Sequence, residues 1–152
     1  MTSNPKVNPW IWVVAWMGLI FFFSTDLFSG SQTSRIIGPL LKWFVPDISD
    51  DSIAAVQLVA RKIAHLLEYA ILSILICRAL VKCGDMQSLP LAALGQSVVF
   101  AAVYAALDEW HQSWTDERFG SLLDVAIDSA GATIGAVFFA WYTRPKKGKA
   151  NS

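Results

Sequence analysis

Three short stretches of the chain hold most of the side chains that could do chemistry. They are RKIAHLLEY at residues 61–69, DEWHQ at residues 108–112, and an apolar run that contains Asp124 and Asp128. Asp124 and Asp128 are four residues apart, so a helix presents both on one face. Carboxylates inside a membrane segment are costly, and they normally face protein interior or trapped water. We therefore expect this face to point inward.

Two glycines follow on the same helical face. Gly131 and Gly135 lie three and seven residues after Asp128, which keeps them on its stripe of the helix. Small residues at such positions let a second helix approach closely. We expect both glycines to be helix-packing residues.

Acidic and histidine side chains form pairs within these stretches, as in His65 with Glu68 and Asp108 with His111. Such pairs on facing helices can hold a metal ion, or can supply a general acid and a general base. The residues alone decide neither, and they identify no cofactor. The candidate metal ligands are His65, Glu68, Asp108 and His111.

Interhelical salt bridges are the alternative explanation for the same charges. The cations Arg61, Lys62 and Arg118 could neutralise the neighbouring carboxylates and so fix how the helices pack. Ionisable groups within a membrane more often mark a functional site, which favours ligand binding. The candidate residues of such a site are Arg61, Lys62, His65, Glu68, Tyr69, Asp108, Glu109, His111, Gln112, Arg118, Asp124 and Asp128.

The composition identifies the class of protein. A chain of 152 residues that is 55% hydrophobic and only 16% charged is too apolar for an ordinary soluble domain, and we expect one membrane domain over residues 1–152. It lacks a long basic cluster with interleaved aromatic residues, so nucleic acid is not an expected partner. Cys77 and Cys83 lack metal-ligand spacing, and we expect free thiols.

Four apolar runs are long enough to cross a bilayer. The expected spans are residues 7–24, 63–81, 90–107 and 121–142, followed by a basic tail at residues 143–152. Trp10 and Trp141 stand at the interfacial ends of the first and last runs. A cleaved signal peptide is the alternative for the first run, but no small-x-small cleavage site follows it.

The connection between the first two spans, residues 25–51, is not simply polar. Leu40, Leu41 and Phe44 recur at helical spacing, whereas Pro39 weakens a regular helix. An interfacial segment and a loop packed on the helix ends both fit this pattern. After it, residues 50–52 offer side chains that could cap the next helix.

Lysine and arginine suggest the orientation. If both termini are cytoplasmic, seven of these residues lie inside and five outside, and the basic tail directly follows the last span. The start of the second span, the end of the third and the start of the fourth then share the outer leaflet. We expect the polar side chains of these three helix ends to form one site that faces out of the cell membrane.

The ordered motifs resemble those of a known family. They are R-K-x-x-H-x-x-E-Y from residue 61, D-E-x-H-Q from residue 108, and R-x5-D-x3-D-x2-G from residue 118. This pattern resembles the VanZ-like family, small multi-spanning bacterial membrane proteins named for a member that raises resistance to teicoplanin. Ser31 and Ser34 are similar to the S-x-x-S segment of that family. The resemblance covers about residues 21–142, and it implies a role in the cell envelope or in antibiotic resistance but no established reaction.

The sequence therefore predicts an all-α integral membrane protein of the bacterial cell (inner) membrane, with four transmembrane helices, cytoplasmic termini and an interfacial segment between helices one and two. The expected function is an outward-facing site for a lipid-linked wall precursor, a glycopeptide or a lipid head group. Arg61, Lys62 and Arg118 would bind its anionic groups, and the carboxylates its cationic or hydroxyl groups. A metal-dependent hydrolase or transferase, and a small structural subunit of a larger membrane complex, are the alternatives.

The orientation is tested by reporter fusions. A fusion after Thr143 should report a cytoplasmic location, and a fusion within residues 113–117 should report an external one, because the basic tail is retained inside. A cytoplasmic reporter at residues 113–117 would place the polar site on the wrong side of the membrane for an external ligand.

Overall fold

The computed structural model describes residues 8–25, 30–84, 91–113 and 121–144, and side chains within these ranges except those of residues 30–34 and 36. The described residues form helices and no strand, which confirms the all-α class. The helices are α1 (Trp10–Phe23), α2 (Gly30–Phe44), α3 (Asp50–Cys83), α4 (Leu91–Gln112) and α5 (Leu122–Tyr142).

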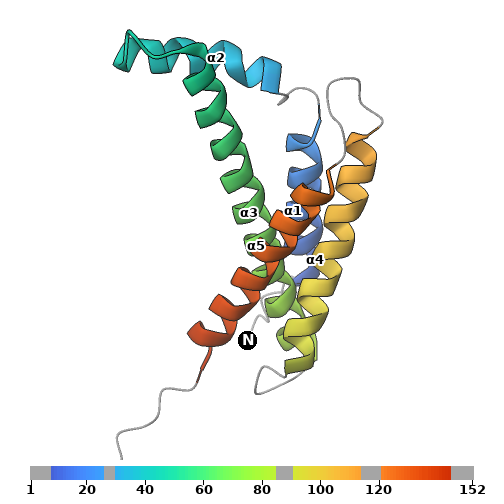
Figure 1. Ribbon diagram of the computed structural model, residues 1–152. Coiled ribbons are helices and arrows are strands. Elements are labelled where there is room, and N and C mark those ends of the chain that lie inside the picture. The colour runs from blue at the N-terminus through green and yellow to red at the C-terminus, as the bar shows by residue number, and fades with distance from the viewer. Residues whose placement is uncertain (1–7, 26–29, 85–90, 114–120, 145–152) are drawn as a thin grey trace, which may run out of the picture.

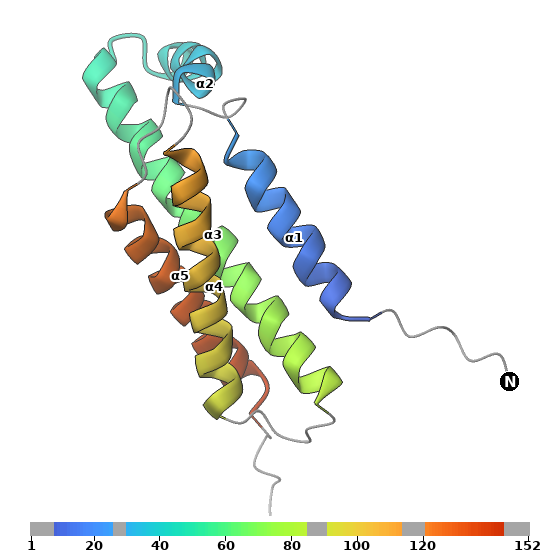
Figure 2. The same cartoon turned by 90° about the vertical axis from the view of Figure 1, so that its right-hand side faces the viewer.

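Four of these helices form a bundle, and α2 lies apart from it across one end of α3 (Figure 1). Helix α5 packs mainly on α3 and also contacts α4, and α1 packs on α3 and is hydrogen-bonded to α4, as by Tyr104 Oη to the Met17 carbonyl at 2.7 Å. Helices α1 and α5 lie on opposite sides of the bundle (Figure 2). The start of α1, the start of α4 and the end of α5 lie at one end of the bundle, and the polar stretches lie at the other.

Three helices, α3, α4 and α5, are long and apolar enough to cross a membrane. Helix α1 has 14 residues, which at about 1.5 Å per residue is shorter than the hydrocarbon core of a bilayer. The predicted first span at residues 7–24 therefore corresponds to a short apolar helix. The predicted second span at residues 63–81 is only part of α3, which has 34 residues and begins at Asp50.

The start of α3 differs from the prediction. Its N-cap is Ser49, whose side chain accepts a hydrogen bond from the Ser52 backbone N–H at 3.2 Å, and not a residue of the expected 50–52 group. Asp50 and Asp51 instead occupy the first turn, where the partial positive charge of the helix N-terminus favours acidic side chains.

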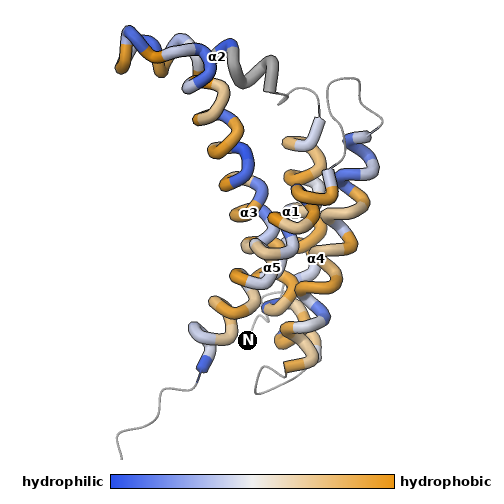
Figure 3. Tube along the Cα trace, in the orientation of Figure 1, coloured by the Kyte–Doolittle hydropathy of each residue, from blue (hydrophilic) through white to orange (hydrophobic). Residues whose placement is uncertain are grey.

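The connection between the first two predicted spans, for which an interfacial segment and a loop were the two alternatives, contains the helix α2. It continues through Pro39, although proline removes one backbone hydrogen bond from the helix. Lys42 forms a salt bridge of 2.8 Å with Asp50, and Gly38 faces Ile53 of α3. Trp43 and Phe44 remain exposed, and α2 shows polar and apolar residues along its length (Figure 3).

Small and apolar side chains fill the core of the bundle. Tyr69, Leu72 and Ile76 of α3 are fully buried, and α4 and α5 supply mostly alanines at their contacts, which allows the helices to lie close together. The outer faces of the helices expose many large apolar side chains, consistent with contact with lipid. Both cysteines are free, as predicted; Cys77 is buried and its thiol donates to Ser97 Oγ at 3.1 Å.

Gly131 and Gly135 lie directly against the backbone of α3. A Cβ atom added to Gly131 would overlap the Leu66 carbonyl oxygen, and one added to Gly135 would overlap the Ala70 carbonyl oxygen. Backbone atoms cannot move aside as the end of a flexible side chain can. The close approach of α5 to α3 therefore requires glycine at both positions.

Replacing Gly131 with alanine should separate α3 and α5 and lower the free energy of unfolding by about 1–3 kcal/mol, as overpacking does in other cores. Gly95→Ala is the matched control, because a Cβ atom there meets nothing within 4 Å. The unfolding midpoint in detergent should fall for Gly131→Ala and stay unchanged or rise for Gly95→Ala. Equal midpoints for the two variants would contradict the contact.

Candidate functional site

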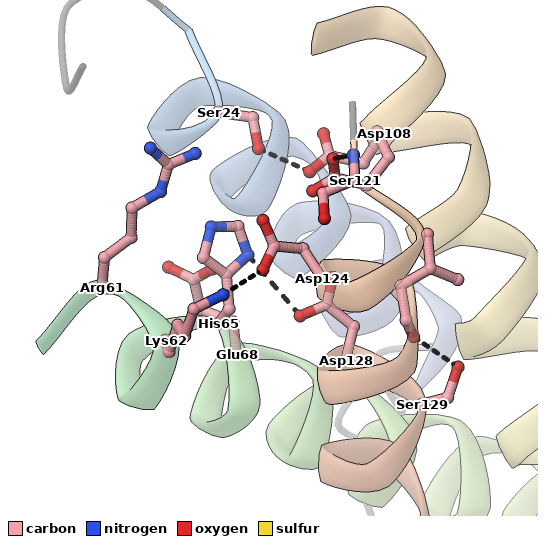
Figure 4. Close-up of polar contacts among 12 residues, drawn as sticks. Ser24, Arg61, Lys62, His65, Glu68, Asp108, Ser121, Asp124, Asp128 and Ser129 are labelled. Carbon is pink, nitrogen blue, oxygen red and sulfur yellow. Dashed lines mark hydrogen bonds and ion pairs between the residues drawn. The ribbon is translucent and has the colours of Figure 1, made fainter. Parts of the chain in front are cut away.

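The polar stretches meet at the end of the bundle where α1 and α4 end, α5 begins and α3 passes by (Figures 1 and 4). Helix α3 contributes Arg61, Lys62, His65 and Glu68, and α5 contributes Asp124 and Asp128. The end of α4 contributes residues 108–112. The end of α4 and the start of α5 thus meet, but residues 61–69, expected near the start of the second span, lie within α3, and the end of α1 takes part although the sequence had not indicated it.

Asp108 is held by the ends of two helices. Its Oδ2 atom accepts a hydrogen bond of 2.6 Å from Ser24 Oγ and one of 3.0 Å from Gln112 Nε2. The Gln112 amide also donates to Ser24 Oγ at 3.2 Å, and all three residues are buried. The network joins the C-cap of α1 to the last turn of α4.

Ser24 is a site residue that the sequence analysis missed. It is the C-cap of α1, directly after three phenylalanines, and its partner Asp108 lies 84 residues away. The only local signal was a small polar residue at the end of an apolar run, which normally indicates no more than a helix end. The predicted Ser31 and Ser34 segment lies outside the described side chains.

Glu109 joins α4 to α5. Its Oε2 atom accepts a hydrogen bond of 2.8 Å from the backbone N–H of Ser121, the N-cap residue of α5 (Figure 4). The carboxylate therefore lies at the N-terminus of α5, where the helix dipole favours negative charge. Its other oxygen, Oε1, is buried and has no hydrogen-bond partner in the described part of the chain.

Two contacts join α3 to α5 side by side (Figure 4). Lys62 Nζ lies 2.6 Å from Asp124 Oδ1, and His65 Nδ1 lies 3.6 Å from Asp128 Oδ1. The first is a short salt bridge, and the second is too long for a hydrogen bond. Pairing is therefore between helices, whereas the sequence analysis emphasised pairs within one helix, such as His65 with Glu68.

Several buried polar atoms at this end of the bundle have no hydrogen-bond partner among the described residues. Such atoms are rare in proteins, because each costs about 1–3 kcal/mol unless water or a ligand satisfies it. The unpartnered atoms are Tyr69 Oη, Asp108 Oδ1, Glu109 Oε1, both Asp128 carboxylate oxygens, and the Nδ1 atoms of His65 and His111.

A model of the VanZ/LLP1 family matches residues 9–143. The chain belongs to this family. The match spans all five described helices, and with them both sides of the polar site. No curated protein and no solved structure matches the chain.

Of the remaining predicted residues of this VanZ/LLP1 chain, the structure describes Arg61, Glu68 and Tyr69. Arg61 Nη2 reaches Gln112 Oε1 at 3.5 Å, at the limit of a hydrogen bond. The Glu68 backbone carbonyl accepts a hydrogen bond of 2.9 Å from Trp16 Nε1. Tyr69 is fully buried beside Tyr104, and Arg118 lies outside the described residues.

The four candidate metal ligands are not gathered around one point. His65 faces Asp128, and the His111 ring packs on Phe21 with centroids 4.7 Å apart. Across the residues that the structure describes, no three histidine, cysteine, aspartate or glutamate side chains are arranged to hold a metal ion. The polar site of this VanZ/LLP1 chain therefore consists of buried carboxylate oxygens, with cations at its edge.

The Lys62–Asp124 salt bridge is tested by a double-mutant cycle. Lys62→Gln leaves the partly buried Asp124 charge unpaired, so the single variant should unfold more readily than the wild type. Asp124→Asn in the same chain should recover part of the loss, with a coupling free energy of about 1 kcal/mol or more.

The exposed Lys42–Asp50 pair is the control cycle. Its side chains are 50% and 88% exposed, against 32% and 21% for Lys62 and Asp124, and solvent screening should leave little coupling. Additive effects in the Lys62–Asp124 cycle would rule out a stabilising contact between these two side chains.

Proposed function

We propose that this VanZ/LLP1 protein acts in the bacterial cell envelope and binds the polar head group of a membrane amphiphile, such as a lipid-linked wall precursor, at the outer leaflet. A contribution to glycopeptide resistance would follow if the bound amphiphile is a precursor of the cell wall. The observation that supports the proposal most is a group of buried oxygens, contributed by Tyr69, Asp108, Glu109 and Asp128, for which the described residues provide no hydrogen-bond partner. We call these four residues the oxygen cluster.

Burying the oxygen cluster costs desolvation free energy, and the packing of the helices does not require these oxygens. Lys62 and Asp124 join α3 to α5 with opposite charges, and the two glycines bring the backbones together. Asp128, whose side chain is 1% exposed, adds a buried carboxylate that accepts no hydrogen bond from the residues that the structure describes. A purely structural subunit would gain stability if this aspartate were apolar, so a binding role explains its presence better.

The position of the cluster favours an amphiphile over a soluble ligand. Lys62 and Asp124 keep part of their surface exposed and form an edge of the site, with the cluster beneath them. The neighbouring faces of α3 and α5 expose Ile63, Leu67 and Leu123. An amphiphile can leave its tail against such apolar surface while its head group enters between the helices.

The edge and the interior of the site offer opposite charges. Arg61 is half-buried, and the structure gives its guanidinium one long hydrogen bond, although the group has five N–H donors. It is suited to an anionic part of a head group, such as a phosphate. The cluster oxygens are suited to hydrogen-bond donors on the same head group.

The proposal is tested with Asp128→Asn and, as its matched control, Asp51→Asn. Asparagine keeps the shape of aspartate but removes the charge, so Asp128→Asn should accumulate in the membrane normally and retain about tenfold less co-purified amphiphile. Asp51→Asn makes the same chemical change at an exposed position away from the site, and it should alter neither membrane abundance nor the amount of co-purified amphiphile.

Membrane abundance and lipids retained through purification, measured by native mass spectrometry, give the result, with glycopeptide sensitivity of the host as a second measurement. Unchanged lipid retention in Asp128→Asn at normal abundance would refute head-group binding by the cluster. Lower abundance and a lower unfolding midpoint, with unchanged lipid retention per molecule, would assign Asp128 to the structure of the bundle.

A further inference from the structure

We propose that the head group bound by the oxygen cluster carries a primary ammonium group, which lies among Asp108, Glu109 and Asp128, while the adjoining phosphate lies at Arg61. The ligand class is therefore an aminophospholipid with a phosphoethanolamine-type head group. This inference rests on the proposed function and adds to it the chemistry of the ligand.

The unused atoms of the cluster are mainly acceptors. Asp108 Oδ1, Glu109 Oε1 and both Asp128 oxygens are buried and find no hydrogen-bond partner within residues 8–25, 30–84, 91–113 and 121–144. A primary ammonium has three N–H donors and no acceptor, so it satisfies several such oxygens at once. A phosphate or carboxylate in the same place would add acceptors and would be repelled.

The charges lead to the same class of ligand. The carboxylates at this end of the bundle are Glu68, Asp108, Glu109, Asp124 and Asp128, and the cations of the described residues are Arg61 and Lys62. Lys62 is already paired with Asp124. Even with Arg118 counted from the sequence, acids outnumber arginine and lysine, and a ligand cation would offset the excess negative charge.

His65 can compensate only part of this charge. In its protonated form it would offset Asp128, whose Oδ1 lies 3.6 Å from His65 Nδ1. Asp108 and Glu109 instead contact neutral donors, Ser24 with Gln112 and the Ser121 backbone, through one oxygen each. Their second oxygens remain for the ligand.

Burial also distinguishes a primary from a quaternary ammonium. Asp108, Glu109 and Asp128 are 3%, 5% and 0% exposed, so a bound cation must replace its hydration by hydrogen bonds to the protein. A choline head group has the same charge but no N–H donor and three methyl groups. It would leave the cluster oxygens unsatisfied, and the site should discriminate against it.

The test compares three phospholipids with identical acyl chains, added to the purified full-length chain after delipidation. Phosphatidylethanolamine has the primary ammonium, phosphatidylcholine has a charge without donors, and phosphatidylglycerol has hydroxyls without a cation. Phosphatidylethanolamine should bind about tenfold more tightly than either of the others, because a charged hydrogen bond contributes about 1.5–3 kcal/mol. Native mass spectrometry gives the relative affinities.

Variants then assign the preference to the cluster. Glu109→Gln and Asp128→Asn should each reduce the ratio of affinities for phosphatidylethanolamine and the other two lipids from about tenfold to about twofold. This corresponds to a loss of about 1 kcal/mol in the difference between the binding free energies. Asp51→Asn should keep the full preference. The wild-type comparison needs no variant, so it remains decisive even where a substitution prevents folding.

Three results would overturn the inference, and they are distinguishable. Equal affinities for the three lipids, with Asp128→Asn weakening the binding of all of them alike, would support head-group binding but contradict the recognition of an ammonium group. A preference for phosphatidylglycerol would assign the cluster to hydroxyl groups. No binding of any of the three, and no retained amphiphile in the native preparation, would overturn both the ammonium and the proposed function.

Discussion

The contact between α3 and α5 is the constraint on which the rest of the structure depends. Gly131 and Gly135 lie against the backbone of Leu66 and Ala70, at a separation that no larger residue permits. The contact fixes the register of the two helices. Nearer the polar end, one and two turns before Gly131, the same register brings Asp128 opposite His65 and Asp124 opposite Lys62.

Charged groups at this end of the bundle have two different roles. Lys62 with Asp124, and Ser24 with Asp108 and Gln112, are matched contacts that join neighbouring helices. Among the described residues, the second oxygens of Asp108 and Glu109 and both Asp128 oxygens have no hydrogen-bond partner, and Asp128 has only the longer ion pair with His65. The matched groups join the helices, and under the proposed function the atoms without a hydrogen bond are those that bind the ligand.

Differences between the expected and observed elements have local physical causes. Residues 36–44 form a helix despite Pro39, which removes only one backbone hydrogen bond, and α2 packs on α3 where Gly38 faces Ile53. Helix α3 begins after Ser49, within a few residues of the start that the capping side chains indicated, and its 34 residues extend well beyond the apolar stretch within it. Hydropathy identifies the apolar part of a helix and gives no information about how far the helix continues into polar sequence.

The sequence by itself determined the helical membrane class, three of the helices capable of spanning and, through the resemblance of its ordered motifs, the family. These properties depend on composition, periodicity and spacing, which are local. Only the tertiary structure decided which partners meet: Lys62 with Asp124, Asp128 with His65, and Asp108 with a serine 84 residues away. Those pairs depend on the rotation and register of neighbouring helices. Close backbone packing between helices sets the rotation and the register, and the spacing of residues within a single helix does not encode them.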